Sequence, residues 1–353
     1  MHIIELLEMT VDRGASDLHL KTGGVPVLRI DGELLPQTEL GTVDAATLAA
    51  YLTELATPQQ LESFNARLEL DFAYGLGERG QFRINAYRQR GTLSLACRTI
   101  GTRIPTIAEL GLPQICEQLA LLRHGLVLIT APAGGGKSTT LAAMMEFLNQ
   151  TEKRNIFTVE DPNEYLYIDN LCIFSQREVG SDTAGFATAL KYVLRQDPDV
   201  IMVGEMRDLE TMRSVLTLAE TGHLVLATLH TPGAAAAIER FIDVFPADQQ
   251  QQVRVQLAMA LEGVLFQSLL PAASGKGRVA AMEILVGTTA VRNLIRENKT
   301  YQLASIMQTG AEFGMQTFNQ SLSKLCRSGL VSREETISYS PDVKELKALL
   351  SNR

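Results

Sequence analysis

The sequence predicts an α/β protein in two parts: a small α+β domain, then a larger domain on a mostly parallel sheet that ends in a helical region. Short apolar alternations broken by glycines fill the first hundred residues, a pattern typical of small antiparallel strands. After residue 113, apolar runs alternate with helical stretches, which indicates a parallel sheet. The length of 353 residues, at roughly 150 residues per domain, agrees with two domains.

Composition and charge narrow the class of protein. With 46% hydrophobic and 20% charged residues, the chain has the make-up of an ordinary globular protein with sizeable cores. The 32 basic and 40 acidic residues leave a net charge of −8, which gives no general electrostatic attraction for nucleic acid. We therefore expect no nucleic-acid partner.

Cysteines and apolar segments indicate the compartment. The four cysteines, which contain no CxxC pair and support neither zinc ligation nor a disulfide scaffold, are Cys97, Cys116, Cys172 and Cys326. The acidic, amphipathic N-terminus is not a signal peptide. The longest apolar stretches, such as 125–131, are far shorter than the ~20 residues that span a bilayer. We expect a cytosolic protein that reaches a membrane only through a partner.

The first part is expected to begin with a helix over residues 2–13. The side chains on its apolar face are Ile3, Ile4, Leu7 and Val11. Strands are expected within 17–35 and 69–100, and an Ala-rich helix over 42–56. Residues 101–113, with two prolines and two glycines, are expected to form a linker.

Arginines accompany the alternating pattern of residues 80–100. Arg83 and Tyr87 share one face of the expected strand, opposite Phe82 and Ile84, whereas the facing of Arg98 stays open. Composition alone favours an ordinary solvated sheet face for these arginines.

The larger domain has strands and helices in alternation. Strands are expected over 125–130, 155–160, 199–205 and 223–230. The helices expected between them cover 138–149, 183–194 and 209–220. From about residue 246 onward the chain is expected to be helical, over 248–270, 289–297, 318–328 and 342–350.

Residues capable of chemistry follow each of the four expected strands. These are a glycine-rich turn, Glu160, Glu205 and His230. Ligands bind at the carboxyl ends of strands in open parallel sheets, so we expect all four to meet at one edge. His223 lies at the opposite end of the last strand and is expected to be structural.

The strongest motif is 131-APAGGGKSTT-140, between an expected strand and an expected helix. Glycines let backbone N–H groups curl around a phosphate, and the helix N-terminus adds its dipole. The residues expected to hold the nucleotide are Ala133, Gly134, Gly135, Gly136, Lys137, Ser138 and Thr139. Lys137 would reach the β- and γ-phosphates, and the Ser138 hydroxyl would ligate Mg²⁺. A flexible glycine turn with an incidental lysine is the alternative.

The acids and the histidine have their own alternatives. Glu205, at the end of an apolar strand beside the glycine-rich turn, fits a carboxylate that orients Mg²⁺ or water, but an isolated Glu is commonly a solvated turn residue. Glu160 could accept a proton from an attacking water, although Asp161-Pro162 is also ordinary turn chemistry. His230 could bond a γ-phosphate, whereas a lone histidine is usually only a satisfied polar residue.

Taken together, the chain resembles the PilT type IV pilus retraction ATPases of the bacterial secretion ATPase superfamily. Eight ordered segments carry this resemblance: ASDLHL at 15–20, QFRINAYRQRG at 81–91, APAGGGKSTT at 131–140, TVEDP at 158–162, RQDPDVIMVGEMRD at 195–208, TGHLVLATLHT at 221–231, VRNLIRE at 291–297 and GMQTFNQSL at 314–322. The chain lacks the four-cysteine zinc site that similar extension ATPases usually carry, and it shows no extra N-terminal domain, which favours retraction.

The resemblance implies an architecture and a set of partners. It implies a PAS-like domain over 1–100, the linker 101–113, a RecA-like ATPase core over 114–270 and a mostly helical region over 271–353. It further implies a homo-hexamer that hydrolyses ATP with Mg²⁺ and drives pilus disassembly at the inner membrane. There the partners would be a platform protein of the pilus machine and a paralogous retraction ATPase.

The resemblance also assigns roles to residues. Lys137 and Ser138 match the Walker A lysine and serine. Glu205 matches the Walker B glutamate, Glu160 the proposed general base and His230 the histidine of the His box. Arg83 and Arg98 match arginines that reach the phosphates from the N-terminal domain. Two positions depart from the family pattern, since Ala131 replaces a glycine and Gly135 the usual serine.

One further segment, 291–299, is implied to couple hydrolysis to retraction. Helical spacing places Val291 and Ile295 inward, with Arg292 and Arg296 outward. Two other functions remain open for the whole chain. One is an accessory paralogue that binds ATP but hydrolyses little, and the other is a DNA-translocating ATPase, which the negative charge disfavours.

Overall fold

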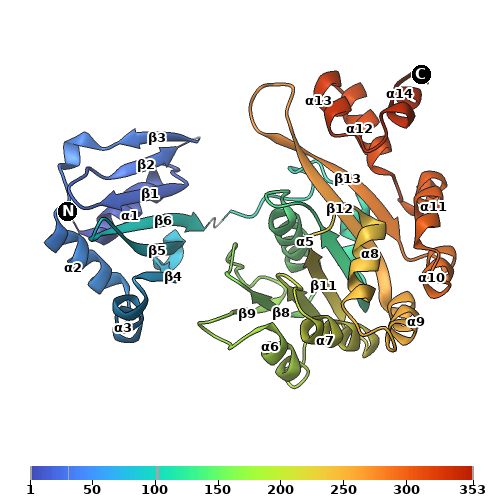
Figure 1. Cartoon of the computed structure of the whole chain (residues 1–353), viewed down its shortest axis with the longest axis horizontal. Helices are drawn as coiled ribbons and strands as arrows, with labels where there is room; N and C mark the ends of the chain where they lie inside the picture. Colours follow the sequence, from blue (N-terminus) through green and yellow to red (C-terminus); the bar gives the residue numbers. More distant parts are fainter. Residues whose placement is uncertain (1, 31, 101–102, 352–353) are drawn as a thin grey trace. The chain divides into compact units, whose positions relative to one another are not determined.

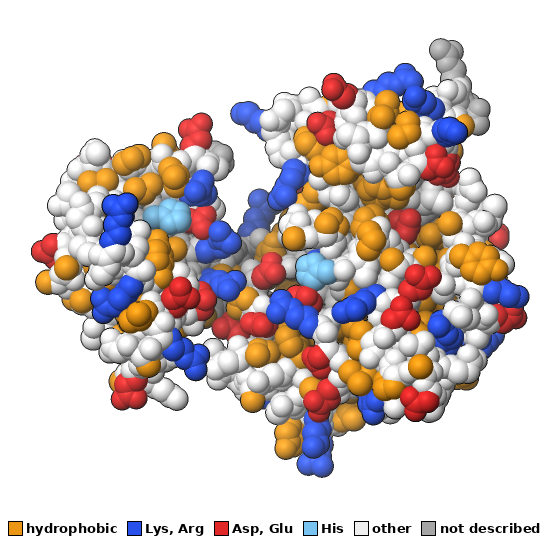
Figure 2. All heavy atoms as spheres, viewed as in Figure 1, with side chains coloured by type: hydrophobic (Ala, Val, Ile, Leu, Met, Phe, Trp, Pro, Cys, Tyr) orange, Lys and Arg blue, Asp and Glu red, His pale blue; other side chains and the backbone are white. Residues whose placement is uncertain are grey.

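The computed structural model describes residues 2–30, 32–100 and 103–351, and the chain divides into two compact units (Figure 1). The first unit spans Met1–Arg103 with Glu164–Leu166, and the second spans Ile104–Asn163 with Tyr167–Arg353. On the face of each unit that Figure 2 shows, basic and acidic side chains are interspersed with hydrophobic ones. Within the described ranges, no helix is both long enough and apolar enough to cross a bilayer.

The described residues of the first unit form a six-stranded antiparallel sheet in the order β3-β2-β1-β6-β5-β4. Its strands are β1 (Asp17–Lys21), β2 (Val27–Ile30), β3 (Glu33–Pro36), β4 (Glu69–Gly75), β5 (Gln81–Gln89) and β6 (Thr92–Ile100). Strands β1 and β6 are far apart in the sequence but pair side by side, with Leu18 opposite Cys97. The expected small antiparallel strands are confirmed.

Helices cover the buried face of this sheet. They are α1 (Ile3–Asp12), α2 (Ala45–Leu55) and α3 (Pro58–Arg67), with 3-10 turns η1 (Thr38–Leu40) and η2 (Gly77–Arg79). The expected helices correspond to α1 and α2. On α1 the buried residues are Ile3, Leu6, Leu7 and Thr10, whereas Ile4 and Val11 are only partly buried. The expected apolar face is confirmed for Ile3 and Leu7, and Ile4 and Val11 pack against the same core, whereas Leu6 was missed.

Helix α3 was not anticipated, although the sequence contains its start signal. The Thr57 hydroxyl accepts from the Gln60 N–H, and the Gln60 side chain accepts from the Thr57 N–H. Such a capping box satisfies two N–H groups that the first turn would otherwise leave unpaired. Phe64 then anchors the helix in the core of the unit.

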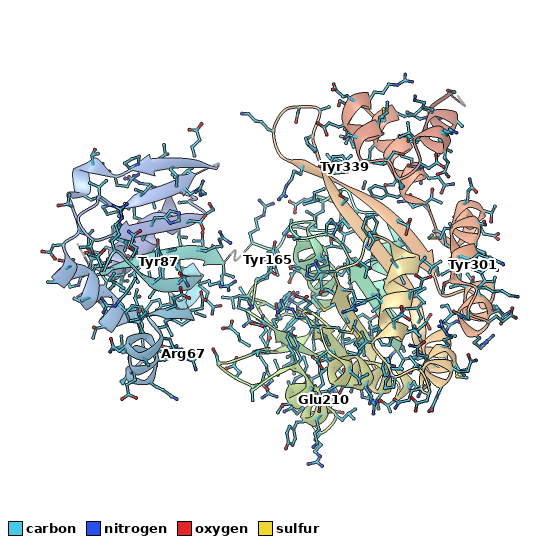
Figure 3. The ribbon with its side chains drawn as sticks, viewed as in Figure 1. Arg67, Tyr87, Tyr165, Glu210, Tyr301 and Tyr339 are labelled. Atoms are coloured by element: carbon cyan, nitrogen blue, oxygen red, sulfur yellow. The ribbon has the colours of Figure 1, made fainter. Side chains whose placement is uncertain are left out.

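Buried side chains alternate with more exposed ones along β5 from Gln81 to Ala86. Phe82 and Ile84 are buried, while Arg83 is exposed on the face that it shares with Tyr87. Figure 3 labels Tyr87. Arg98 is exposed opposite the buried Cys97, so its facing is settled without any shift in register. Arg83 and Arg98 are direct cross-strand neighbours, and the structure brings these two side chains together.

In the described part of the second unit, the sheet has seven strands in the order β13-β12-β7-β11-β10-β8-β9. They are β7 (Gly125–Thr130), β8 (Asn155–Glu160), β9 (Ile173–Glu178), β10 (Val200–Val203), β11 (Leu224–Leu229), β12 (Leu261–Pro271) and β13 (Arg278–Val286). All neighbours are parallel except β12 and β13, which are antiparallel. The mostly parallel sheet and its four expected strands are confirmed.

Helices pack on both faces of this sheet. They are α4 (Ile115–Ala120), α5 (Lys137–Thr151), α6 (Phe186–Val193), α7 (Leu209–Glu220), α8 (Ala234–Asp243) and α9 (Gln250–Ala260). On β7, Leu126 and Leu128 join the core under α6 to α9, while Val127 and Ile129 join the core under α4 and α5. Burial on both faces explains why these strands are continuous apolar runs.

Part of the expected linker belongs to the hydrophobic core of the second unit. Ile107 and Leu112 are buried there, packed with residues of α4 and α5. Residues 101 and 102, where the linker was expected to begin, lie outside the described residues.

The expected helix over 248–270 is wrong beyond residue 260. Helix α9 ends at Ala260 and β12 begins at Leu261, with a register shift against β7 between Leu261 and Gly263. The segment Leu261–Pro271 is mostly apolar, and such a segment fits a buried strand as well as a buried helix, so its pattern alone could not separate them. Strand β12 pairs with β7, and its hairpin with β13 extends the sheet past residue 271, where a helical region was expected to begin.

Helices follow the β12–β13 hairpin (Leu261–Val286). They are α10 (Thr289–Arg296), α11 (Leu303–Thr309), α12 (Phe318–Arg327), α13 (Arg333–Ser338) and α14 (Val343–Ser351), with turns η3 (Thr300–Gln302) and η4 (Ala311–Phe313). Phe318 of α12 packs edge-on against Phe266 of β12, with ring centroids 5.2 Å apart. Figure 3 labels Tyr301 and Tyr339, two exposed aromatic residues of this region.

Candidate active site

The carboxyl ends of four neighbouring strands bring the expected site residues to one edge of the sheet. Strand β7 leads into the glycine-rich loop (residues 131–136), and β8 ends at Glu160. Glu205 comes two residues after β10, and His230 directly follows β11. Because β7, β11, β10 and β8 are consecutive in the sheet, these ends adjoin one another.

The glycine-rich loop turns tightly from β7 into α5. Gly134 and Gly136 have φ values of +71° and +86°, which an L side chain rarely adopts. Gly136 is the N-cap of α5, so Lys137, Ser138 and Thr139 form the first turn, where backbone N–H groups lack helical partners. A helix start of this kind attracts phosphate.

The two departures from the family pattern, Ala131 and Gly135, touch each other. Ala131 is fully buried and is not among the residues with positive φ, so alanine fits there without backbone strain. A Cβ built on Gly135 would lie 2.6 Å from the Ala131 Cβ, closer than two carbons can pack. The alanine at 131 therefore requires glycine at 135.

Lys137, His230 and Glu205 form one chain of contacts beside the loop. The Lys137 Nζ lies 3.1 Å from His230 Nδ1 and 3.3 Å from the Ala131 carbonyl oxygen. His230 Nε2 lies 3.3 Å from Glu205 Oε1. Because an ammonium can only donate, Nδ1 is the acceptor, which leaves the proton of a neutral imidazole on Nε2, the nitrogen nearer to Glu205. The structure thus joins three of the predicted residues.

Glu205 is held as a charged carboxylate. Arg207 donates to its Oε2 at 2.8 Å. This hydrogen bond lowers the pKa of Glu205, burial opposes it, and the positive charges of Arg207 and Lys137 lower the pKa further. A carboxylate with this charge can hold a metal-bound water or orient an attacking water.

Glu160 lies one strand further along the same edge. Its carboxylate is buried, and Gln176 of β9 donates to its Oε1 at 3.5 Å. Gly204 approaches closely, since a Cβ there would lie 3.2 Å from the Glu160 Cα. The absence of a side chain at 204 lets the turn that carries Glu205 lie directly against Glu160.

His223 is structural, as expected. It lies just before β11, at the strand end opposite His230. Its Nδ1 lies 3.1 Å from the Thr221 hydroxyl and 3.2 Å from the Leu218 carbonyl oxygen, so it closes the end of α7.

Two residues that the sequence did not single out also contact the loop. Gln267 of β12 donates to the Gly135 carbonyl at 2.8 Å, and Arg278 of β13 donates to the Gly134 carbonyl at 3.3 Å. Both were hidden because their segment was expected to be helical. Pairing of β12 with β7, with Phe266 opposite Thr130, is the signal that places Gln267 beside the loop.

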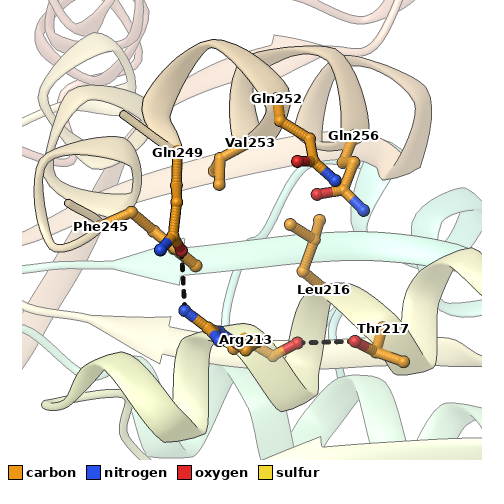
Figure 4. Close-up of a pocket in the computed structure, with 8 residues that line it drawn as sticks. All are labelled: Arg213, Leu216, Thr217, Phe245, Gln249, Gln252, Val253 and Gln256. Carbon is orange, nitrogen blue, oxygen red and sulfur yellow. Dashed lines mark hydrogen bonds between the residues drawn. The ribbon is translucent and has the colours of Figure 1, made fainter. Parts of the chain in front are cut away.

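A hollow of about 370 Å³ adjoins the start of α5. It is lined by polar and apolar side chains, among them Thr139, Thr140, Gln267, Leu269 and Arg278. A second hollow of about 360 Å³ lies between α7 and α9, around Arg213, Phe245 and Gln249 (Figure 4). None of the predicted site residues lines the second hollow, so it is separate from the candidate active site.

Arg83 and Arg98 belong to the first unit, where each faces an acid. The Arg98 Nε lies 2.9 Å from Asp17 Oδ1, and the Arg83 Nε lies 4.0 Å from Asp71 Oδ1. Burial alone would raise the pKa of Asp17, but the hydrogen bonds from Arg98 and Ser16 outweigh burial and lower it. Both arginines are well exposed and could exchange these acids for a phosphate.

The candidate site contains oxygen atoms that could bind a divalent cation. No cluster of three or more His, Cys, Asp or Glu side chains suited to a metal occurs among the described residues. The Ser138 hydroxyl and the Glu205 carboxylate are the oxygen donors that Mg²⁺ prefers when substrate phosphates complete its shell. The donor set therefore fits Mg²⁺ bound together with a nucleotide.

Comparison with known proteins identifies the family. A family model described as Type II/IV secretion system protein matches residues 3–275. The chain belongs to this family. The Type IV pilus retractation ATPase PilT of Pseudomonas aeruginosa is 46% identical over 334 residues, covering 95% of this chain and 96% of PilT. The resemblance to retraction ATPases is thereby confirmed.

Other members of the family are similar over nearly the whole chain. The Type IV pilus ATPase PilU of P. aeruginosa is 40% identical over 350 residues, covering 99% of this chain and 91% of PilU. The crystal structure of the pilus retraction motor PilT with bound ADP matches with a TM-score of 0.92 and 43% identity, covering 99% of each chain. The mixed α/β architecture is thus that of a secretion ATPase.

Proposed function

We propose that this chain is an ATPase motor that hydrolyses ATP to power type IV pilus retraction, and with it twitching motility. The observation that carries the proposal is the contact chain from Lys137 through His230 to Glu205 beside the glycine-rich loop. It occurs in a chain 46% identical to a relative named for pilus retraction.

The phosphates would lie against the glycine-rich loop and the first turn of α5. N–H groups from Ala133 to Thr139 would cradle them, and Lys137 would leave His230 to meet their charge. The hollow beside Thr139, Leu269 and Arg278 would take the base and ribose.

Hydrolysis would use the carboxylates and the histidine. Ser138 and Glu205 would hold Mg²⁺, Glu205 through water, and the cation would supply charge neutralisation at the phosphates. Glu160 would take the proton of the attacking water. Once Lys137 turns to the phosphates, His230 would donate to the γ-phosphate from Nδ1 only with a proton on that nitrogen, because phosphate oxygens accept.

The assembly is part of the proposal. The first unit would be a PAS-like domain and the second a RecA-like core with a helical C-terminal region. Six copies would form a ring in which Arg83 and Arg98 reach the phosphates. The ring would work in the cytoplasm, peripheral to the inner membrane, against a platform protein and beside a paralogous ATPase, without nucleic acid.

The decisive test replaces Glu205 with glutamine. Carboxamide and carboxylate have nearly the same shape, so E205Q should bind ATP as the wild type does and lose at least about 100-fold in phosphate release, the usual effect of removing one electrostatic group. Wild-type turnover in E205Q would overturn the assignment of Glu205. DNA-stimulated hydrolysis would favour a translocase.

A second candidate is an accessory paralogue that binds ATP with little turnover. Deletion of the gene separates the two functions: excess surface pili with lost twitching indicates the main motor, whereas retained twitching with slow ATP hydrolysis by the purified chain indicates the accessory.

A further inference from the structure

Gln267 sits at the back of the glycine-rich loop, buried almost completely at 2% exposure. Its Nε2 donates to the Gly135 carbonyl at 2.8 Å, and its Oε1 accepts from the Thr140 hydroxyl at 2.6 Å. A carbonyl can only accept, so the amide nitrogen must be the atom that faces Gly135. The carboxamide therefore joins the loop to the first turns of α5 in one orientation.

This contact sets the direction of a loop N–H group. In a planar trans peptide, the C=O of one residue and the N–H of the next point in opposite directions. Gln267 holds the Gly135 carbonyl toward β12, so the Gly136 N–H of the same peptide points away from β12. Gly136 precedes Lys137, where the N–H groups of a phosphate-binding loop meet the anion.

Close packing around Gly136 also holds the glycine-rich loop against β12. A Cβ on Gly136 would lie 2.7 Å from Gln267 Nε2 and 3.2 Å from a Leu269 methyl group. The loop thus lies directly on the side chains of β12. Arg278, from the other strand of the β12–β13 hairpin, holds the preceding carbonyl, that of Gly134.

We infer that Gln267 is a positioning residue for phosphate binding, which aims the Gly136 N–H by holding the Gly135 carbonyl. The inference rests on the proposed nucleotide binding and adds a residue outside the loop to it. Because Gln267 would act through the loop, its removal should weaken the binding of a nucleotide more when the loop holds more phosphate groups.

The experiment replaces Gln267 with methionine, which keeps the length and volume of the side chain and removes both hydrogen bonds. Calorimetric titration of the full chain with ADP and with AMP measures the two dissociation constants. Q267M should raise the Kd for ADP about tenfold, the value of one well-placed hydrogen bond. The Kd for AMP should change less than about twofold.

The matched control is Gln316→Met. Gln316 is also a buried glutamine with two hydrogen bonds, to the Met282 carbonyl and from Lys324, but it lies away from the loop. Q316M should lower the melting temperature about as much as Q267M and leave both Kd values unchanged. If Q267M does not fold, Gln267→Asn, which is too short to reach Gly135, replaces it.

The outcomes separate the inference from the proposed function. An unchanged ADP Kd in Q267M, or equal loss for ADP and AMP, overturns the positioning role while wild-type binding of ADP still supports the function. A wild-type chain that binds ADP no better than AMP overturns both.

Discussion

At the scale of single residues, the loop shows how two unusual choices compensate each other. The resemblance implies glycine at 131 and serine at 135, whereas this chain has Ala131 and Gly135. The Ala131 side chain occupies the space that a side chain at 135 would need. Each departure viewed alone suggests a weakened loop, but the pair together keeps one side chain in the same small space.

The pair predicts strongly non-additive mutations. Gly135→Ser alone would force its Cβ to 2.6 Å from that of Ala131 and should weaken ADP binding more than about tenfold. Ala131→Gly alone should change affinity less than tenfold, because Ala131 is unstrained. The double variant should return to within about threefold of the wild type, a coupling of 1–3 kcal/mol by calorimetry, within the range of ~0.5–3 kcal/mol for contacting residues.

Additive mutations would contradict the predicted coupling between Ala131 and Gly135. Additive effects of the two substitutions, with the double variant as weak as G135S, would mean that the loop relaxes around each side chain independently. Ser268→Ala, on the strand that carries Gln267, serves as a control for general loss of folded protein.

At the scale of elements, the β12–β13 hairpin connects the loop to the C-terminal helices. Glu283 on β13 accepts from the Ala234 N–H at 2.7 Å, at the start of α8, and also from the Phe318 N–H, at the start of α12. Burial raises the pKa of Glu283, and these two backbone bonds only partly oppose the rise. One buried carboxyl thus satisfies the N-termini of two helices.

Glu283 predicts a particular pH dependence of stability. Because its pKa is raised in the folded chain, its stabilising contribution is full below the ordinary pKa of Glu and declines as pH rises through the folded value. Glutamine does not titrate, so Glu283→Gln should be more destabilising near pH 4 than near pH 7, relative to the wild type. Urea unfolding at both pH values measures this, and a difference independent of pH would contradict it.

Helix α10 corrects the expectation that Arg292 faces outward. Its guanidinium donates to the carbonyls of Gly287 and Ala258 at 2.7 and 2.9 Å, and also to that of Met259. Its NH2 atom lies 2.7 Å from Glu262 Oε1. Arg292 therefore ties α10 to the end of α9, while Asn293 is exposed and Arg296 is partly exposed.

The two arginines of α10 should consequently behave differently. Arg292→Glu removes these bonds and places an acid beside Glu262, which should cost about 3 kcal/mol of unfolding free energy. Arg296→Glu should leave stability and ATP hydrolysis intact and stop twitching if this helix couples hydrolysis to retraction. Thermal melts and a motility assay compare the variants; twitching by R296E cells would leave α10 a structural helix.

The sequence predicted the site residues that depend on a local pattern along the chain, and it missed the residues whose position depends on which strands and helices pack together. The strands that carry Glu160, Glu205 and His230 were predictable, because unbroken apolar runs followed by polar residues indicate strand ends. Gln267 was not, because an apolar run after α9 fits helix and buried strand equally. Arg292 was misplaced for a similar reason: helical spacing cannot show that carbonyls of another helix lie above it.

At the scale of the whole molecule, the predicted site is divided between two units. Lys137, Glu205 and His230 lie in the second unit, whereas Arg83 and Arg98 lie in the first. The arginines adjoin across β5 and β6, and Arg83 lies near the exposed Asp71 whereas Arg98 bonds to the buried Asp17. A surface pair such as that of Arg83 and Asp71 is worth no more than about 1 kcal/mol, so a phosphate can displace Asp71 at little cost.

Substitution of either arginine should therefore affect turnover more than binding. Arg83→Ala and Arg98→Ala should lower the rate of hydrolysis about 100-fold or more, as loss of a group that stabilises transition-state charge does. Arg29→Ala is the matched control for Arg98, since Arg29 also contacts Asp17, with its Nε 3.8 Å from Oδ2. Wild-type turnover in R98A, or equal loss in R29A, would remove Arg98 from the site.

A mixing experiment decides whether neighbouring copies share the site. R98A lacks a working arginine and E205Q lacks a working carboxylate, so each variant alone should be inactive. If the arginine of one copy serves the carboxylate of another, mixed rings contain some sites in which both groups are wild type. When the two variants are mixed at random in equal amounts, about one site in four should contain both wild-type groups. The mixture should therefore have up to about a quarter of the wild-type activity, because a site with its charge-stabilising group hydrolyses ATP at the wild-type rate. If each copy supplies its own arginine, no mixed ring contains a complete site.

Phosphate release after subunit exchange measures the difference, and an inactive mixture with proven exchange would place the whole site within a single chain.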